Sequence, residues 1–204
     1  MKKSILLIVA CVFAFVTVQA QSSEVETASQ LTKAEQFKNK STFIKEDVIY
    51  KYQGQGTKLF AKLFTDLKTG EQLAALEFYP SAGQQLMNSM VGTVSKPLGY
   101  LDMDAIDDLL LALGTMVEIS KTSNKQDEFS ITYIAPGGID LFFNKYDNGS
   151  EILTLRKKWY SIDDYGVQTV NYSEGWISIA GSAIPKLISS IKEAQAIANQ
   201  ALAK

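Results

Sequence analysis

Apolar and polar residues alternate along much of the chain, which is the pattern of β-strands that bury one face. Turn residues separate these runs, among them Gln53-Gly54-Gln55-Gly56, Lys68-Thr69-Gly70 and Asp147-Asn148-Gly149. An Asn-Gly pair between two apolar runs is the strongest short-range indication of a hairpin. The pattern predicts strands over 43–52, 59–67, 72–79, 129–135, 139–146 and 151–160, with one or two more at 167–170 and 176–180.

Two other stretches carry apolar residues at helical spacing. From Ile106 to Val117 they recur at i, i+3, i+4, i+7 and i+11, and the chain closes with a similar stretch from Ile184 to Leu202. Such spacing places the apolar residues on one face of a helix, ready to cover a sheet. A short helix is also expected near residues 32–39, with Leu31 and Phe37 as its only apolar anchors.

The two groups of elements correspond at a fixed spacing of about 79 residues, and such a spacing is the sequence signature of a repeat. Gly149 follows Gly70 at this spacing, and Phe142-Phe143 follows Leu63-Phe64 at the same one. The predicted helices correspond almost in the same register, with Asp104 opposite Ser182. We therefore expect a duplicated strand-strand-strand-(strand)-helix unit.

This order of elements predicts an α+β fold in which antiparallel sheets are covered by two long helices. Residues 41–204 would form a single domain of two similar halves, about 41–120 and 121–204. The halves would pack helix to helix, or lay both helices on one curved sheet. PUR and Whirly-type nucleic-acid binders are similar in element order, but the chain carries no motif of either, and a shared fold does not imply a shared function.

The first 20 residues have the features of a secretory signal peptide. Lys2 and Lys3 precede an apolar run that ends at Val18, and Val18-Gln19-Ala20 supplies small residues at a cleavage site. We expect export to the periplasm or the extracellular space, with no transmembrane segment after cleavage. Lipid attachment at Cys11 is the weaker alternative, because the apolar run continues beyond that cysteine. Residues 21–40 are expected to be a polar, partly disordered lead-in.

Composition excludes many kinds of chemistry. The chain has no histidine, and its one cysteine lies inside the expected signal peptide. The mature protein would therefore lack a Ser-His-Asp triad, a Cys-His pair, a thiolate zinc site and a disulfide. Any metal would need oxygen ligands, as calcium does, and we expect no cofactor. The net charge of −2 gives no reason to expect a nucleic-acid partner.

Three stretches resemble an uncharacterised family of small exported bacterial proteins. They are Phe37-x-x-Lys40-Ser41-x-Phe43-Ile44-Lys45-Glu46, Thr65-Asp66-Leu67-x-x-Gly70 and Leu101-Asp102-x-Asp104-x-Ile106-Asp107. The resemblance implies export and a single domain of helices and strands. It implies no activity.

Four aspartates at the start of the first long helix form the most concentrated group of possible ligands. Asp102, Asp104, Asp107 and Asp108 could offer oxygens to calcium, but they do not follow the helix-loop-helix calcium pattern. As a helix start, Asp104 would be the N-cap, matched by Ser182, and Asp107 and Asp108 would suit the helix dipole. Only Asp102 lacks a structural explanation, and it remains a tentative ion ligand.

Three further groups of residues are candidates for binding or for the core. Arg156-Lys157-Lys158-Trp159-Tyr160 could bind an anion, but a strand would divide its charges between two faces. The set Phe60, Phe64, Phe78, Phe142 and Phe143 is expected in the core. A tentative ligand-binding group, suited to peptide or carbohydrate, consists of Tyr160, Asp164, Tyr165 and Trp176.

These observations together favour a non-enzymatic, exported protein of the cell envelope that acts as a binding or interaction module. Its partner would be an envelope protein, a peptide or a glycan. The alternative is a carboxylate-dependent hydrolase or a calcium-binding protein. A hydrolase of the glycosidase type would need two acids about 5–9.5 Å apart in a cleft, and the sequence does not reveal which acids would pair.

Overall fold

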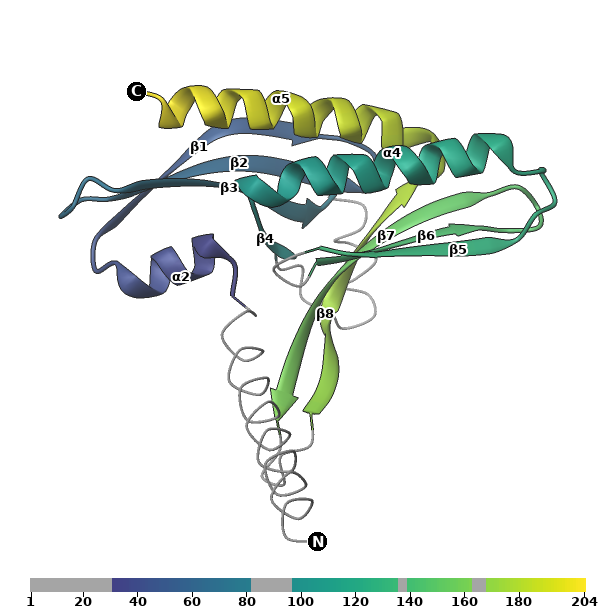
Figure 1. Ribbon diagram of the computed structural model, residues 1–204, viewed down its shortest axis with the longest axis horizontal. Helices are drawn as coiled ribbons and strands as arrows, with labels where there is room; N and C mark the ends of the chain where they lie inside the picture. Colours follow the sequence, from purple (N-terminus) through teal and green to yellow (C-terminus); the bar gives the residue numbers. More distant parts are fainter. Residues whose placement is uncertain (1–30, 82–96, 136–138, 163–167) are drawn as a thin grey trace, which may run out of the picture.

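The strands of the protein form two antiparallel sheets. The computed structural model describes residues 31–81, 97–135, 139–162 and 168–204 (Figure 1). Each sheet has four strands that are neighbours in sequence, in the orders β1-β2-β3-β4 and β5-β6-β7-β8. The strands are β1 (Ile44–Gln53), β2 (Thr57–Asp66), β3 (Gln72–Pro80), β4 (Gly99–Asp102), β5 (Phe129–Ile134), β6 (Ile139–Lys145), β7 (Glu151–Ile162) and β8 (Gln168–Ala180).

A short 3₁₀ turn and a long helix follow each sheet, which confirms the α+β class and the two predicted long helices. The elements are η1 (Met103–Ala105) and α4 (Ile106–Thr122) after the first sheet, and η2 (Gly181–Ala183) and α5 (Ile184–Leu202) after the second. The two halves therefore share one element order. A short helix, α2 (Lys33–Lys40), precedes the first sheet. Duplication of one ancestral unit stays a prediction.

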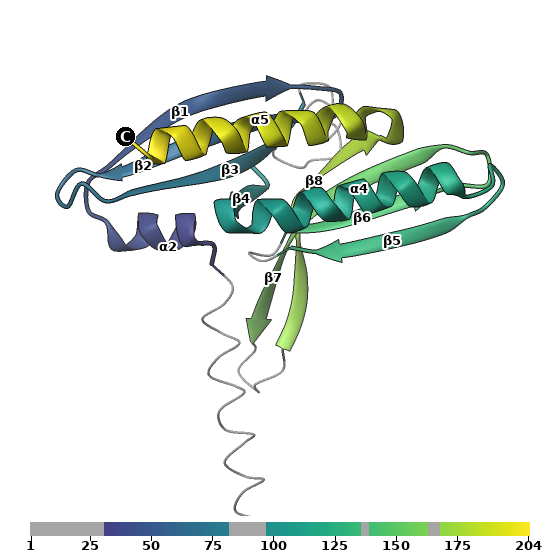
Figure 2. The same ribbon diagram turned by 45° about the horizontal axis from the view of Figure 1, so that its top comes forward.

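The long helices are exchanged between the halves. Helix α5, which follows the second sheet, packs against β1, β2 and β3 of the first (Figures 1 and 2). The Tyr50 hydroxyl of β1 donates to Glu193 Oε2 of α5 at 3.0 Å. Helix α4 lies over the second sheet, where the Lys145 ammonium of β6 donates to the Ser120 carbonyl at 3.2 Å. Each half thus supplies the cover for the other half's sheet.

One hydrophobic core joins both sheets and both long helices. The predicted core residues Phe64, Phe78 and Phe143 are buried, but Phe60 and Phe142 are only partly buried. Those two side chains point away from the long helices. The Phe60 ring lies edge-on to Tyr79, and the Arg156 guanidinium lies 5.7 Å from the Phe142 ring centre. The prediction that Phe60 and Phe142 lie in the core was therefore wrong. Side chains alternate along a strand, so half of them point to its outer face.

Helix α2 covers the outer face of the first sheet, the face that points away from α5. Ala34 and Phe37 are buried there with Phe64 and Ala75 in a second, smaller apolar cluster. Leu31, predicted as an anchor of this helix, is 48% exposed, so Ala34 takes that role. Residues 33–40 of the expected lead-in are therefore ordered helix.

The β2–β3 and β6–β7 hairpins differ by one residue. Thr65 pairs with Gln72 in the first sheet, whereas Lys145 pairs with Glu151 in the second, so the second turn is one residue shorter. Both turns place glycine at positive φ, 74° at Gly70 and 78° at Gly149. Because side chains alternate between faces, a one-residue shift reverses them. Phe64 therefore faces α2 while Phe143 faces α4, and the apparent match of these two phenylalanines in the sequence repeat is not structural.

The last two strands extend beyond the rest of the second sheet (Figure 1). The predicted strands near 167–170 and 176–180 are one strand, β8, which pairs with β7 along its length except for an irregularity between Arg156 and Lys158. Among the described residues, no helix has the length and apolar character needed to cross a membrane.

Candidate functional site

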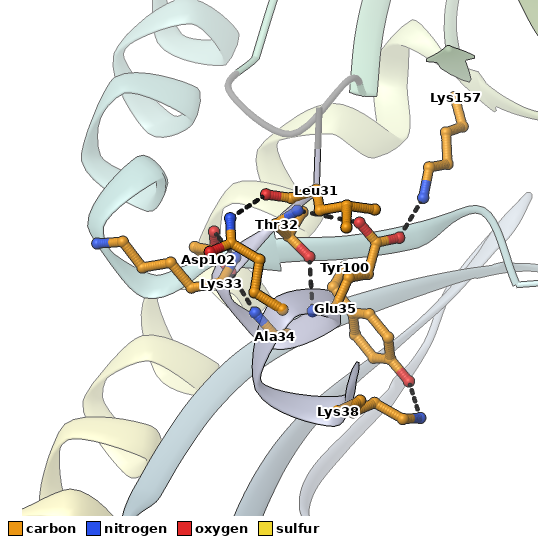
Figure 3. Close-up of polar contacts among 10 residues, drawn as sticks. Leu31, Thr32, Lys33, Ala34, Glu35, Lys38, Tyr100, Asp102 and Lys157 are labelled. Carbon is orange, nitrogen blue, oxygen red and sulfur yellow. Dashed lines mark hydrogen bonds and ion pairs between the residues drawn. The ribbon is translucent and has the colours of Figure 1, made fainter. Parts of the chain in front are cut away.

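Asp102 binds the N-terminus of helix α2 (Figure 3). Its carboxylate accepts the backbone N–H of Lys33 at 2.7 Å and that of Ala34 at 3.2 Å. Thr32 and Glu35 complete a capping box, because the Thr32 hydroxyl accepts the Glu35 N–H and the Glu35 carboxylate accepts the Thr32 N–H. The N–H groups at the start of α2, which a helix leaves without internal partners, are thereby paired. Asp102 now has a structural explanation that the sequence did not provide.

Asp104 makes a different contact. Its carboxylate pairs with the Lys33 ammonium at 2.5 Å, and both side chains are exposed. The hydrogen bond from Lys33 lowers the pKa of Asp104. Burial, by contrast, raises the pKa of Asp102, against the effect of its two backbone N–H bonds. Asp102 therefore caps α2, whereas Asp104 forms an exposed ion pair with Lys33.

The predicted N-caps Asp104 and Ser182 were wrong. Each lies in the middle of the 3₁₀ turn before its long helix, and the residues at the N-cap positions of α4 and α5 are Ala105 and Ala183. An N-cap residue needs extended backbone to turn its side chain onto the helix, and the 3₁₀ turn prevents this. Asp107 and Asp108 do lie in the first turn of α4, as predicted.

The acidic stretch does not converge on one point. Asp107 accepts a hydrogen bond from the Gln195 amide of α5 at 2.9 Å, whereas Asp102 and Asp104 face α2. Within the described residues, no group of three or more acidic, histidine or cysteine side chains is arranged to hold a metal ion. Ion binding at Asp102 stays a prediction, and it would have to compete with the two N–H groups of α2.

We expect Asp102→Ala to lower the free energy of unfolding by about 1–2 kcal/mol, because it removes the partners of two helix N–H groups. Helix α2 should also become more sensitive to proteases. Asp104→Ala is the matched control, since an exposed ion pair contributes about 0–1 kcal/mol. Urea denaturation and limited proteolysis would measure both effects. Equal behaviour of the two variants would contradict the capping role of Asp102.

A chain of charges lies on the outer face of the first sheet, next to α2. The Lys62 ammonium is 2.5 Å from Glu46 Oε1 and 2.5 Å from Glu77 Oε2. Lys38 of α2 lies 3.3 Å from Glu46 and donates to the Tyr100 hydroxyl at 3.1 Å. Lys62 and Glu77 are both buried. These charged and polar side chains connect the four strands of the first sheet with α2.

A buried lysine is a candidate nucleophile or base only if it loses its proton near neutral pH. Burial favours that loss, but hydrogen bonds to Glu46 and Glu77 outweigh it, and the pKa of Lys62 is raised. Lys62 is therefore a permanent cation between two carboxylates. This cluster was not predicted from the sequence, although a lysine and a glutamate at otherwise apolar strand positions could have indicated it.

The basic segment 156–160 is also divided. The Lys157 ammonium pairs with Glu35 of α2 and so ties the second sheet to that helix (Figure 3). The Arg156 side chain is exposed on the opposite face. Two neighbouring charges on opposite faces are what the strand pattern predicted. The side chains of residues 158–175 are outside the described part of the structure.

A groove of about 540 Å³ lies between the C-terminal end of α4 and the N-terminal end of α5. Its polar side chains are those of Ser120, Lys121, Ser150, Glu151 and Ser182. The Ser120 hydroxyl donates to the Glu151 carboxylate, which also packs against Gly181. Glu151 is the single acid among the described residues that line this groove, so the groove does not supply the two acids that a glycosidase needs.

The outer face of the second sheet, which points away from α4, offers a different kind of surface. Register places Thr132, Phe142, Thr154 and Ser178 side by side across the four strands. Arg156 and Trp176 are partners in the next row. Arg156 is exposed, and Phe142, Thr154, Trp176 and Ser178 are partly exposed. We call these six residues the second-sheet outer face.

The predicted ligand-binding residues fall partly on this surface. Trp176 belongs to it. Tyr160 is in β7 opposite Val170, beyond the irregularity in the β7–β8 pairing, and its side chain is not described. Asp164 and Tyr165 lie outside the described residues. Whether the four residues act together therefore stays a prediction.

Comparisons with known proteins do not assign the chain to a family. No family model matches it, and a search of curated proteins finds no match to its sequence. The resemblance to small exported bacterial proteins stays a prediction, and the function must be argued from the chain itself.

Proposed function

We propose that this protein is an exported, non-enzymatic binding module of the cell envelope, and that it binds its ligand on the second-sheet outer face. The proposal rests on one observation above the others. The first sheet's outer face is covered by α2, whereas no helix of the described chain covers the corresponding face of the second sheet.

The placement of the charged groups supports a binding role over a catalytic one. The carboxylates of Glu46 and Glu77 pair with Lys62, and that of Glu35 pairs with Lys157. A general acid needs a pKa near the working pH, but Lys62 and Lys38 lower the pKa of Glu46 more than burial raises it. These groups hold α2 and the two sheets together.

The chemistry of the second-sheet outer face supports a glycan or peptide as the ligand. Phe142 and Trp176 provide flat apolar area, and Thr154 and Ser178 provide hydroxyl groups beside it. Arg156 adds a charged donor next to the Phe142 ring. Apolar and aromatic area with a few placed polar groups is typical of ligand sites. A surface of this kind suits an extended chain.

We expect Arg156→Ala and Trp176→Ala each to weaken ligand binding by at least about tenfold, since arginine and tryptophan carry much of the energy of binding surfaces. Arrays of cell-envelope glycans and extended peptides, probed with the purified protein, would identify the ligand. Calorimetric titration would then compare the variants with the wild-type protein.

The matched control is Lys186→Ala, which also removes an exposed cation but lies on α5. It should bind as the wild-type protein does. Release of a cleaved product would contradict the proposal and favour a hydrolase. A rise in the unfolding temperature with calcium would favour the calcium-binding alternative, because a ligand of the native state stabilises it.

A further inference from the structure

Three of the four outer sheet edges are protected against pairing with another strand. Strand β1 carries a bulge between Val48 and Tyr50 and several charged residues. Strand β4 is in contact with α2, and β8 contacts β2 and β3 of the first sheet. Bulges, charges and covering elements are the usual means by which proteins prevent edge-to-edge association.

Within the part of the chain that the structure describes, strand β5 has none of these protections. Its sequence, Phe-Ser-Ile-Thr-Tyr-Ile, contains no charge, proline or glycine, and its pairing with β6 is regular. Aromatic and β-branched residues, which favour strands, occupy five of its six positions. Figure 2 shows β5 at the free margin of the second sheet, with no helix or strand of the described chain beyond it.

The free edge of β5 presents backbone hydrogen-bonding groups at its even-numbered residues. Ala135 N–H donates to the Ile139 carbonyl at 3.0 Å, so this pair bonds directly across the ladder. Because such pairs alternate with pairs that do not bond, Phe129, Ile131 and Tyr133 direct their backbone groups to β6. The backbone groups of Ser130, Thr132 and Ile134 therefore point outward.

We propose that β5 pairs with β5 of a second copy of this chain, in antiparallel orientation, and joins the two second sheets into one eight-stranded sheet. A two-fold axis perpendicular to the sheet keeps both copies of α4 on the same side. With this axis, odd-numbered residues of one strand pair with odd-numbered residues of the other, and even-numbered residues pair with even-numbered ones. The interface is isologous, so the same surface serves both copies.

The side chains of β5 are complementary to themselves in this arrangement. An axis through Ile131 pairs Phe129 with Tyr133 of the second copy, Ile131 with its own counterpart, and Ser130 with Thr132. Aromatic pairs and Ser–Thr pairs are favourable across antiparallel strands. Phe129, Ile131 and Tyr133 are only partly buried under α4, and a further strand would cover them.

Helix α4 adds apolar area on the same side. Burial, and then the charge of Asp108 on α4, raise the pKa of Tyr133 on β5. Thr115 and Ile119, seven and eleven residues further on, lie on the same face of the helix as Asp108. Ile119 is 40% exposed and Ile134 at the end of β5 is 60% exposed. The proposed pairing would bring this flank of α4 toward its counterpart.

Sedimentation velocity of the full chain at about 1–100 μM tests the pairing, because the dimeric fraction of the protein rises with its concentration. The wild-type protein should sediment as a dimer at the upper end. Thr132→Lys should raise the dimer dissociation constant by at least about tenfold, since it places like charges on one face of the paired strands. Thr154→Lys makes the same change on the same face, two strands away from the edge, and should leave the dimer intact.

Circular dichroism would confirm that both variants remain folded. A wild-type protein that stays monomeric throughout would overturn the proposal and would leave the β5 edge for an extended peptide. A dimer that Thr132→Lys does not weaken would also overturn it. Equal loss of the dimer in both variants would place the interface on the sheet face and contradict edge pairing.

Discussion

Replacing Lys62 with methionine is expected to lower the free energy of unfolding by about 3–5 kcal/mol, the usual cost of removing one partner from a buried ion pair. Methionine fills a volume similar to that of lysine, so the loss of stability comes from the missing positive charge. Glu77 is 2% exposed and would remain in the sheet without its cation. Urea denaturation at pH 7 would measure the effect.

Two controls separate charge from packing. Lys62→Met combined with Glu77→Leu should recover most of the lost stability, because both charges are then absent. Lys121→Met makes the same substitution in an exposed pair with Glu118 and should change the free energy of unfolding by less than about 1 kcal/mol. A double variant as unstable as the single one would contradict an ion-pair origin of the effect.

The effect should also depend on pH. The pKa of Lys62 is raised, so its contribution is complete below the ordinary lysine pKa and is lost only as pH rises through the raised value. The pKa of Glu46 is lowered, so its contribution is lost as pH falls through that value. In Lys62→Met, the pKa of Glu46 loses the lowering effect of Lys62, so Glu46 takes up a proton at a higher pH than in the wild-type protein. The difference between variant and wild type should therefore narrow as pH falls from 7 to about 4.

Replacing Ile191 with alanine is expected to cost about 2–5 kcal/mol, as for other buried isoleucines. Ile191 is fully buried in α5, which follows the second sheet but packs on the first. The helix exchange therefore makes a specific prediction. Hydrogen exchange should show lost protection in β1–β3 as well as in β6–β8.

Leu111→Ala is the matched control for this substitution. Leu111 lies on the other long helix, α4, and is 71% exposed. Its truncation should change the free energy of unfolding by less than about 0.5 kcal/mol. Destabilisation by Ile191→Ala that is confined to the second sheet would contradict the exchange of helices between the halves.

Local patterns predicted most of the elements, because strand alternation, helical spacing and turn residues are clear in the sequence. The helical spacing from Ile106 and from Ile184 gives the start of each long helix, and Gly70 and Gly149 give the hairpin turns. The fold class follows from their order. The exchange of helices could not be predicted, because an apolar face shows that a helix covers a sheet but not which sheet.

One error arose because a one-residue difference in a hairpin reverses the faces of a strand. The shorter hairpin before Glu151 places Phe143 on the opposite face from Phe64, despite their matching letters. The partners of Asp102 could not be predicted from the sequence either, because the N–H groups of Lys33 and Ala34 lie 69 and 68 residues away along the chain. Contacts at that separation depend on the packing of α2. Candidate sites that rely on such contacts cannot be located from the sequence alone.

We propose that ligand binding occurs on the second-sheet outer face, while the acidic stretch holds the fold together. Backbone amide chemical shifts, recorded during titration with the strongest ligand from the arrays, would locate the site directly. We predict that the largest changes fall at Phe142, Thr154, Trp176 and Ser178. Changes concentrated at residues 102–108, or the absence of any ligand for the folded protein, would contradict the claim.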